Sequence, residues 1–115
     1  MGVIKKRSDF LAMKGADKAH SASFLMLARA NPQPGTENED LTRLGLTVTK
    51  KLGGAVIRNR IKRRLRAAAR EVFPHSAKPG MDYVLVARKA AYDRNYAVLL
   101  DDMKRALLRL SGSTT

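Results

Sequence analysis

The feature that most constrains this chain is a basic segment between residues 50 and 70. It contains nine basic residues and no Asp or Glu. Within it, apolar residues recur at the spacing of one face of an α-helix, namely Ile57, Ile61, Leu65, Ala68 and Val72. The segment therefore predicts an amphipathic helix that buries one apolar stripe and exposes cations around nearly all of its remaining surface.

The cations of this helix have no acidic neighbours to compensate them. Arg58, Lys62 and Arg66 stand at i,i+4 spacing, where like charges repel, and Arg58 and Arg60 lie close to the positive end of the helix dipole. Each conflict costs on the order of a few tenths of a kcal/mol, but all act in the same direction. Arg58, Arg60 and Arg64 are expected near the edges of the apolar stripe. Because planar guanidinium groups suit phosphate oxygens, the segment indicates phosphate-backbone binding.

Composition supports a basic globular protein of one domain. The chain has 115 residues, a formal net charge of +13 and 44% hydrophobic residues, so a polyanion is the expected partner: nucleic acid first, an anionic membrane surface second. There is no cysteine, which excludes disulfides, cysteine-ligated zinc and thiol catalysis. No apolar run approaches the roughly 20 residues of a membrane span, and the N-terminus lacks the apolar core of a signal peptide, so a cytoplasmic protein is expected.

The remaining pattern predicts an α+β sandwich, with helical segments around a small sheet. The expected elements are a short helix over 8–14, strands over 23–29 and 43–49, the basic helix, a central strand over 82–88 and a helix over 93–110. Pro74 and Pro79-Gly80 are expected to end the basic helix. A single RNA-binding domain over 1–115 is expected, with a long flexible loop at about 31–41 and loose tails at 1–7 and 111–115.

Other functions for a basic helix fit less well. A membrane-surface helix favours aromatic and bulky side chains on its apolar side, whereas this stripe suits packing on a sheet. A helix-turn-helix reader needs a second helix shortly upstream, where this sequence predicts a strand. A nuclear localisation tract needs no apolar stripe. RNA is favoured over DNA because a sheet-plus-helix module without a two-fold reader suits recognition of shape and single strands.

The sequence offers no catalytic residues of its own. Glu37, Glu39 and Asp40 fall in the predicted loop, while Asp101 and Asp102 are adjacent on a helix and diverge by about 100°. The two histidines are far apart and stand in no motif. No metal site is expected in the chain either, so the residues predict a binding protein rather than an enzyme acting alone.

The order of residues in the basic segment resembles a known signature. Lys50 to Arg63 read KKLGGAVIRNRIKR, which strongly resembles the signature of the protein subunit of bacterial ribonuclease P. RLGLTVTKK before it and DYVLVARKAA at 82–91 are similar to strands of that family, and the closing helix is in register. The resemblance fits residues 43–110 well and the N-terminal helix loosely, through Asp9-Phe10.

The resemblance implies an αβββαβα two-layer sandwich with a small mixed sheet and a left-handed crossover through the basic helix, where physics alone predicts a right-handed one. It also implies that a catalytic RNA subunit removes the 5′ leader of precursor tRNA using Mg²⁺ held by RNA. The protein then aids this reaction by binding the leader and the RNA subunit. A monomeric protein in a 1:1 ribonucleoprotein is expected, with no membrane partner and no small-molecule substrate.

The family's RNA-contacting helix carries over to the basic segment of this chain. The expected RNA-binding residues are Lys50, Lys51, Arg58, Asn59, Arg60, Lys62, Arg63, Arg66 and Arg70. The expected residues of the leader cleft are Phe10, Met13, Thr47, Thr49 and Arg88. Phe10 matches an aromatic of the family's cleft, with a place in the core as the alternative, whereas Met13 stands where relatives often carry a second aromatic. Leader recognition is therefore expected to depend on charge and shape more than on stacking.

One function of another class remains as the alternative. A structural protein of ribosomal type would bind ribosomal RNA and never meet precursor tRNA. The family's fold is similar to that of some ribosomal-protein domains, so the fold alone does not separate the two. The signature around Arg58, Asn59 and Arg60 favours the ribonuclease P subunit.

Overall fold

The computed structural model describes residues 2–3, 17–30, 42–77 and 81–112. Its elements in chain order are β1 (Gly2–Val3), β2 (Asp17–His20), β3 (Phe24–Ala30), β4 (Arg43–Thr47), the 3₁₀-helix η1 (Lys50–Leu52), α2 (Ala55–Ser76), β5 (Met81–Ala87), the 3₁₀-helix η2 (Lys89–Tyr92) and α3 (Tyr96–Gly112). The short helix expected over 8–14 and the loop expected at 31–41 lie outside the described residues.

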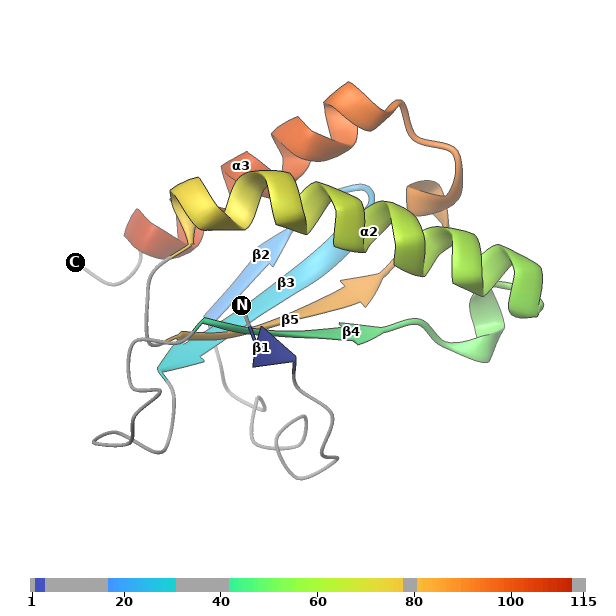
Figure 1. The fold of residues 1–115 in the computed structure, drawn as a ribbon, viewed down its shortest axis with the longest axis horizontal. Coiled ribbons are helices and arrows are strands. Elements are labelled where there is room, and N and C mark those ends of the chain that lie inside the picture. Colours follow the sequence, from blue (N-terminus) through green and yellow to red (C-terminus); the bar gives the residue numbers. More distant parts are fainter. Residues whose placement is uncertain (1, 4–16, 31–41, 78–80, 113–115) are drawn as a thin grey trace.

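The strands form one mixed sheet in the order β1-β4-β5-β3-β2. β1 and β5 both run parallel to β4, whereas β3 is antiparallel to β5 and β2 is antiparallel to β3. Figure 1 shows α2 and α3 side by side on the same face of this sheet. The α+β class is confirmed, and so is the central position of the strand at 81–87.

The apolar stripe of α2 packs on the sheet as its spacing predicts. Ile61, Leu65 and Val72 are buried, and Ile57 packs partly buried against the same core. Further along the helix, the ring of Phe73 meets that of Tyr83 of β5 edge to face, with 5.2 Å between centroids. Burial of this stripe stabilises the helix far more than its propensity does, because each fully buried large side chain contributes about 1.5–3 kcal/mol.

The opposite face of the sheet carries polar groups at one end. Register places Arg43 of β4 and Arg29 of β3 on either side of Asp82 of β5. Asp82 is buried, and Arg43 donates to its two carboxylate oxygens from Nε at 2.8 Å and from a terminal nitrogen at 2.6 Å. This paired geometry is what allows a carboxylate to lie inside the protein.

Several boundaries differ from the sequence expectations, and two of these differences have a clear physical reason. α2 does not end at Pro74 but continues to Ser76, and the N–H of Ala77 still donates to the carbonyl of Phe73 at 2.9 Å. Pro74 has no N–H, so the backbone hydrogen bond to the carbonyl of Arg70 is missing. Arg70 lies on the exposed side of α2, in the last turns of the helix, where this loss is tolerated. α3 begins at Tyr96 rather than at 93, because Asn95 Oδ1 accepts the N–H of Ala97 and so caps the helix.

A third difference is strand β2, Asp17–His20. Its residue pattern alone predicts no strand, although the resemblance implies three strands before the basic helix. β2 pairs along its whole length with β3, from Asp17 opposite Ala28 to His20 opposite Leu25. The strand therefore forms through its partner, with only Ala19 buried.

A candidate nucleic-acid interface on helix α2

One flank of α2 faces η2, and the cations on that flank bind the protein itself. Arg64 donates from Nε to the carbonyl of Ala91 at 2.9 Å and from a terminal nitrogen to the carbonyl of Arg94. Arg60 donates from Nε to the carbonyl of Tyr92 at 2.9 Å, and its guanidinium lies 5.0 Å from the centre of the Tyr92 ring. These two arginines therefore hold the segment after β5 against α2.

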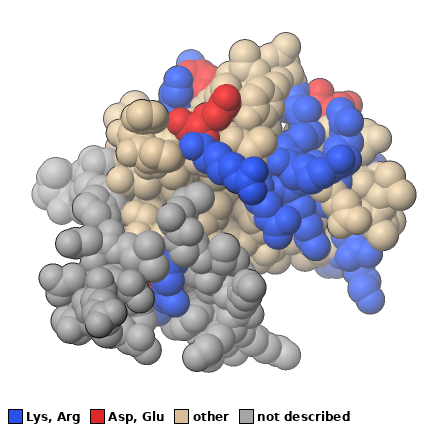
Figure 2. Space-filling model, viewed as in Figure 1, with Lys and Arg blue, Asp and Glu red and all other residues tan. Residues whose placement is uncertain are grey.

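The other flank and the outer side of α2 present cations to solvent. We call the basic surface the group formed by Lys50, Lys51, Arg58, Asn59, Lys62, Arg63, Arg66 and Arg70. Arg58 and Lys62 are half-buried and its other members exposed. Within the described ranges none of its cations has an ion-pair partner. Figure 2 shows Lys and Arg gathered into a broad area over α2, with few acids beside them.

The N-terminus of α2 adds positive potential to this surface. Gly54 caps the helix without any side-chain hydrogen bond, and the first turn has no acid. The free N–H groups and the helix dipole therefore act in the same sense as the cations. Gly53, with φ of 145°, lets η1 turn closely onto α2, since a Cβ there would lie 2.8 Å from Ile57 Cδ1. The exposed Lys50 and Lys51 thereby lie next to the first turn.

Three of the five residues expected in the leader cleft fall at one end of the sheet. Thr47 lies opposite Val86 in the parallel pair of β4 and β5, so Thr49 and Arg88 follow at the carboxyl ends of these two strands. Thr47 is half-buried, and Thr49 and Arg88 are exposed. Phe10 and Met13 lie outside the described residues.

Arg88 has contacts that the sequence did not predict. One terminal nitrogen donates to the carbonyl of Ser21 at 2.7 Å, and the other lies 3.0 Å from His20 Nδ1. Its backbone N–H donates to the carbonyl of Ser23 at 2.9 Å. Arg88 therefore bridges from the end of β5 to the turn between β2 and β3.

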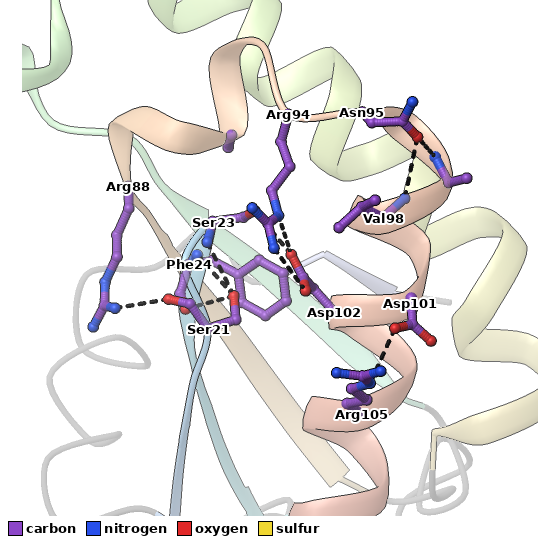
Figure 3. A network of polar contacts seen from close by, with 12 residues as sticks. Ser21, Ser23, Phe24, Arg88, Arg94, Asn95, Val98, Asp101, Asp102 and Arg105 are labelled. Carbon is purple, nitrogen blue, oxygen red and sulfur yellow. Dashed lines mark hydrogen bonds and ion pairs between the residues drawn. The ribbon is translucent and has the colours of Figure 1, made fainter.

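A second polar network joins the β2–β3 turn, the loop between η2 and α3, and α3 itself (Figure 3). Arg94 donates from Nε to Asp102 Oδ2 at 2.6 Å, and the hydroxyl of Ser23 donates to the same oxygen at 3.1 Å. The hydrogen bond to Asp102 is the main cause that raises the pKa of Arg94. Because Arg64 binds the carbonyl of Arg94, the basic helix is connected to this network. The one signal in the sequence is the position of Asp102 on the predicted helix 93–110, three residues after Leu99, which the structure buries.

Three of the described carboxylates pair with arginines. Asp82 binds Arg43, Asp102 binds Arg94, and the exposed Asp101 lies 3.0 Å from Arg105. In the part of the chain that the structure describes, no group of three or more His, Cys, Asp or Glu could hold a metal ion. None of the described helices is both long and apolar enough to span a membrane. The cations on α2 give this arrangement the charge that a polyanion would need.

Comparison with known proteins identifies the family. The profile described as Ribonuclease P matches residues 2–111. The "Ribonuclease P protein component" of Paramagnetospirillum magneticum is 44% identical over 95% of this chain and 82% of that protein, and that of Caulobacter vibrioides is 46% identical over 95% and 70%. Among solved structures, the RNase P protein of Staphylococcus aureus has a TM-score of 0.74 at 29% identity, covering 95% of this chain and 94% of that one. The RNase P protein of Thermotoga maritima has a TM-score of 0.73 at 26% identity, covering 91% and 97%. The chain therefore belongs to the ribonuclease P protein family.

Proposed function

We propose that this chain, as a protein subunit of the endoribonuclease ribonuclease P, binds RNA through the basic surface of α2. The observation that carries this proposal is the division of α2 into two sides. Arg60 and Arg64 on one flank bind backbone carbonyls of the protein. The cations of the basic surface have no such partners among the described residues, and phosphates of RNA would compensate them.

The basic surface would act by charge neutralisation. The RNA subunit and the precursor tRNA are both polyanions, so their association is opposed by repulsion and requires counterions. A protein that places cations between them releases condensed counterions and lowers the Mg²⁺ concentration needed for assembly. Helix α2 supplies these cations on a rigid element packed on the sheet, which reduces the ordering cost of binding.

The 5′ leader of precursor tRNA would lie near the carboxyl ends of β4 and β5. Thr47 and Thr49 supply hydroxyl groups there, and Arg88 supplies a cation already oriented by Ser21. Single-stranded leaders vary in sequence, and a short row of hydroxyl and cationic groups binds a backbone without reading bases. Contacts by Phe10 and Met13 remain predictions.

Mg²⁺ is assigned to the RNA and not to this chain. The ion takes oxygen ligands such as carboxylates and phosphates. Asp82 and Asp102 already accept hydrogen bonds from arginines, so these two carboxylates do not suit a metal. The protein would act as a monomer in a 1:1 complex with its RNA in the cytoplasm.

The salt dependence of RNA binding tests the interface. The variant K62Q/R66Q removes two cations of the basic surface, and the control K18Q/K104Q removes two exposed cations on β2 and α3. If each lost cation contacted one phosphate, the slope of log K against log salt should fall by about 0.9 per contact, hence by roughly two in the first variant. An equal effect in both variants would contradict the assignment of the interface to α2.

Leader dependence tests the substrate. Precursor tRNA with a 5′ leader should bind the assembled ribonucleoprotein more tightly than mature tRNA, and removal of the protein should abolish the difference. A structural role on ribosomal RNA is not favoured by the comparisons, and it predicts no such difference.

A further inference from the structure

A polar pocket lies at the edge of the sheet away from the basic surface. It has a volume of about 200 Å³ and opens between the β2–β3 turn and α3. His20 and Ser21 line it from the turn, and Asp102, Arg105 and Arg109 line it from the helix. In the strand order β1-β4-β5-β3-β2, β2 is three strands from β4. With neighbouring strands about 4.8 Å apart, the pocket lies at the β2 edge, roughly 14 Å across the sheet from β4.

The one carboxylate in the pocket is already neutralised. Asp102 accepts hydrogen bonds from Arg94 and Ser23, at 2.6 and 3.1 Å, and its side chain is only 11% exposed. Figure 3 shows Asp102 directed toward Arg94 and Ser23. Its charge is therefore satisfied from the protein side, and it opposes an incoming anion only weakly.

The two arginines of the pocket are available to a ligand. Arg105 pairs with Asp101 at 3.0 Å, but both side chains are well exposed, at 77% and 52%, so this pair contributes little and exchanges readily. Arg109 is exposed and has no partner among the described residues. At i,i+4 spacing on α3 the two side chains lie on one face and can converge on one group.

The turn side of the pocket is held in place by Arg88. This residue binds the carbonyl of Ser21 and lies 3.0 Å from His20 Nδ1. Ser21 Oγ accepts the N–H of Ser23 and of Phe24, both at 3.1 Å, which closes the turn on itself. The pocket wall is thus ordered before a ligand arrives, and little ordering cost remains for binding.

We propose that this pocket binds a backbone phosphate of an RNA strand, with Arg105 and Arg109 as the donors. Guanidinium groups match phosphate oxygens in shape and charge, and the volume exceeds that of several waters at about 30 Å³ each. The site goes beyond the interface on α2, because none of its residues belongs to the basic surface. With both sites occupied, RNA would contact the protein at α2 and at the β2 edge of the sheet, and two contacts fix the orientation of the protein on the RNA as well as the affinity.

Site-resolved NMR of the ¹⁵N-labelled full chain tests this proposal. The protein is titrated with inorganic phosphate and, separately, with a short single-stranded RNA, while the amides of Ser21, Ala22 and Ala106 report on the pocket. Both ligands should shift these amides. The variant R109Q should weaken binding at the pocket amides by up to about fivefold, the upper limit for one exposed charge pair. The control K104Q removes an exposed cation of the same helix and should leave the response unchanged.

Three results would overturn the proposal. The first is that the pocket amides respond to neither ligand. The second is that they respond to phosphate but not to RNA, which would identify a site for a free anion. The third is an equal loss in R109Q and K104Q. Shifts of α2 amides in the same RNA titration report on the basic surface separately, so failure of one site is distinguished from failure of the other.

Discussion

Arg43 and Asp82 form a two-pronged ion pair across the parallel strands β4 and β5, with N–O distances of 2.8 and 2.6 Å. Their exposures are unequal: the side chain of Arg43 is 22% exposed and that of Asp82 only 1%. The aspartate is therefore the member that depends on its partner, because a buried carboxylate without compensation is costly. The pair also fixes the register of the two strands whose carboxyl ends carry Thr47 and Arg88.

Loss of Arg43 should destabilise the protein more than loss of the whole pair. The variant R43M leaves Asp82 buried with less compensation and should lower the free energy of unfolding by about 3 kcal/mol, near the lower end for buried pairs since Arg43 is partly exposed. The variant R43M/D82L removes both charges and should be more stable than R43M. Urea unfolding followed by circular dichroism measures both. A double variant no more stable than R43M would contradict the prediction.

Arg64 and Arg66 should affect different properties although they are two residues apart. R64Q loses the bonds to the carbonyls of Ala91 and Arg94 and should lower stability by about 1–3 kcal/mol, with an unchanged salt slope of RNA binding. R66Q should change stability by less than about 0.5 kcal/mol and reduce the slope by about 0.9. Chemical unfolding and RNA binding at several salt concentrations separate the two. The reverse pattern would mean that the flanks of α2 have been assigned the wrong way round.

The two adjacent glycines before α2 should differ sharply in their tolerance of a side chain. G53A places a Cβ at φ of 145° and 2.8 Å from Ile57, and should cost about 1–3 kcal/mol. G54S has open space around its Cβ and can cap the helix with its hydroxyl, so a gain of a few tenths of a kcal/mol is expected, on the order of N-cap preferences. Thermal melts of the two variants check both signs. Equal melting temperatures would show that the strain at Gly53 is relieved elsewhere.

Tyr96 should make the protein less stable in alkali. Burial, followed by the hydrogen bond that its hydroxyl donates to Glu71 at 3.0 Å, raises the pKa of Tyr96 above its ordinary 10.0. Above pH 10 the unfolded chain loses this proton before the folded protein does, so the stabilisation present below that pH is lost as pH rises through the folded pKa. The variant Y96F removes this contribution. The unfolding free energy of the parent chain should fall more steeply above pH 10 than that of Y96F, and parallel curves would exclude the effect.

The elements with a clear pattern of apolar residues could be predicted from the sequence. The strand that depends on backbone pairing with another strand could not. α2 follows from apolar residues three and four apart, and β5 follows from a continuous run of β-formers that is covered on both sides by neighbouring strands. β2 has the residues DKAH, of which one is buried, and it exists because its backbone bonds to β3. No local pattern records such a partner.

The sequence predicts which cations lie on α2, but not which of them face solvent and which contact the protein. The surplus of cations predicts α2 as the element that binds RNA. Which cations face inward depends on the carbonyls of Ala91, Tyr92 and Arg94, about thirty residues further along the chain. The Nε of Arg60 donates to the carbonyl of Tyr92, whereas the side chain is exposed, and its contact with RNA stays a prediction. Only the packing of η2 against α2 separates the cations that bind backbone carbonyls from those that face solvent.

The start of α2, where Gly54 caps the helix without a side-chain hydrogen bond and cations cluster beside the first turn, has a consequence for the amount of folded protein. Repulsion among these cations destabilises the folded state, and a bound polyanion relieves it. The free energy of unfolding then rises with the logarithm of the ligand concentration divided by its dissociation constant. RNA would thus be a folding partner as well as a binding partner. Free protein would be the less durable form, more exposed to proteolysis, and its steady-state level would follow the supply of RNA without any dedicated regulator.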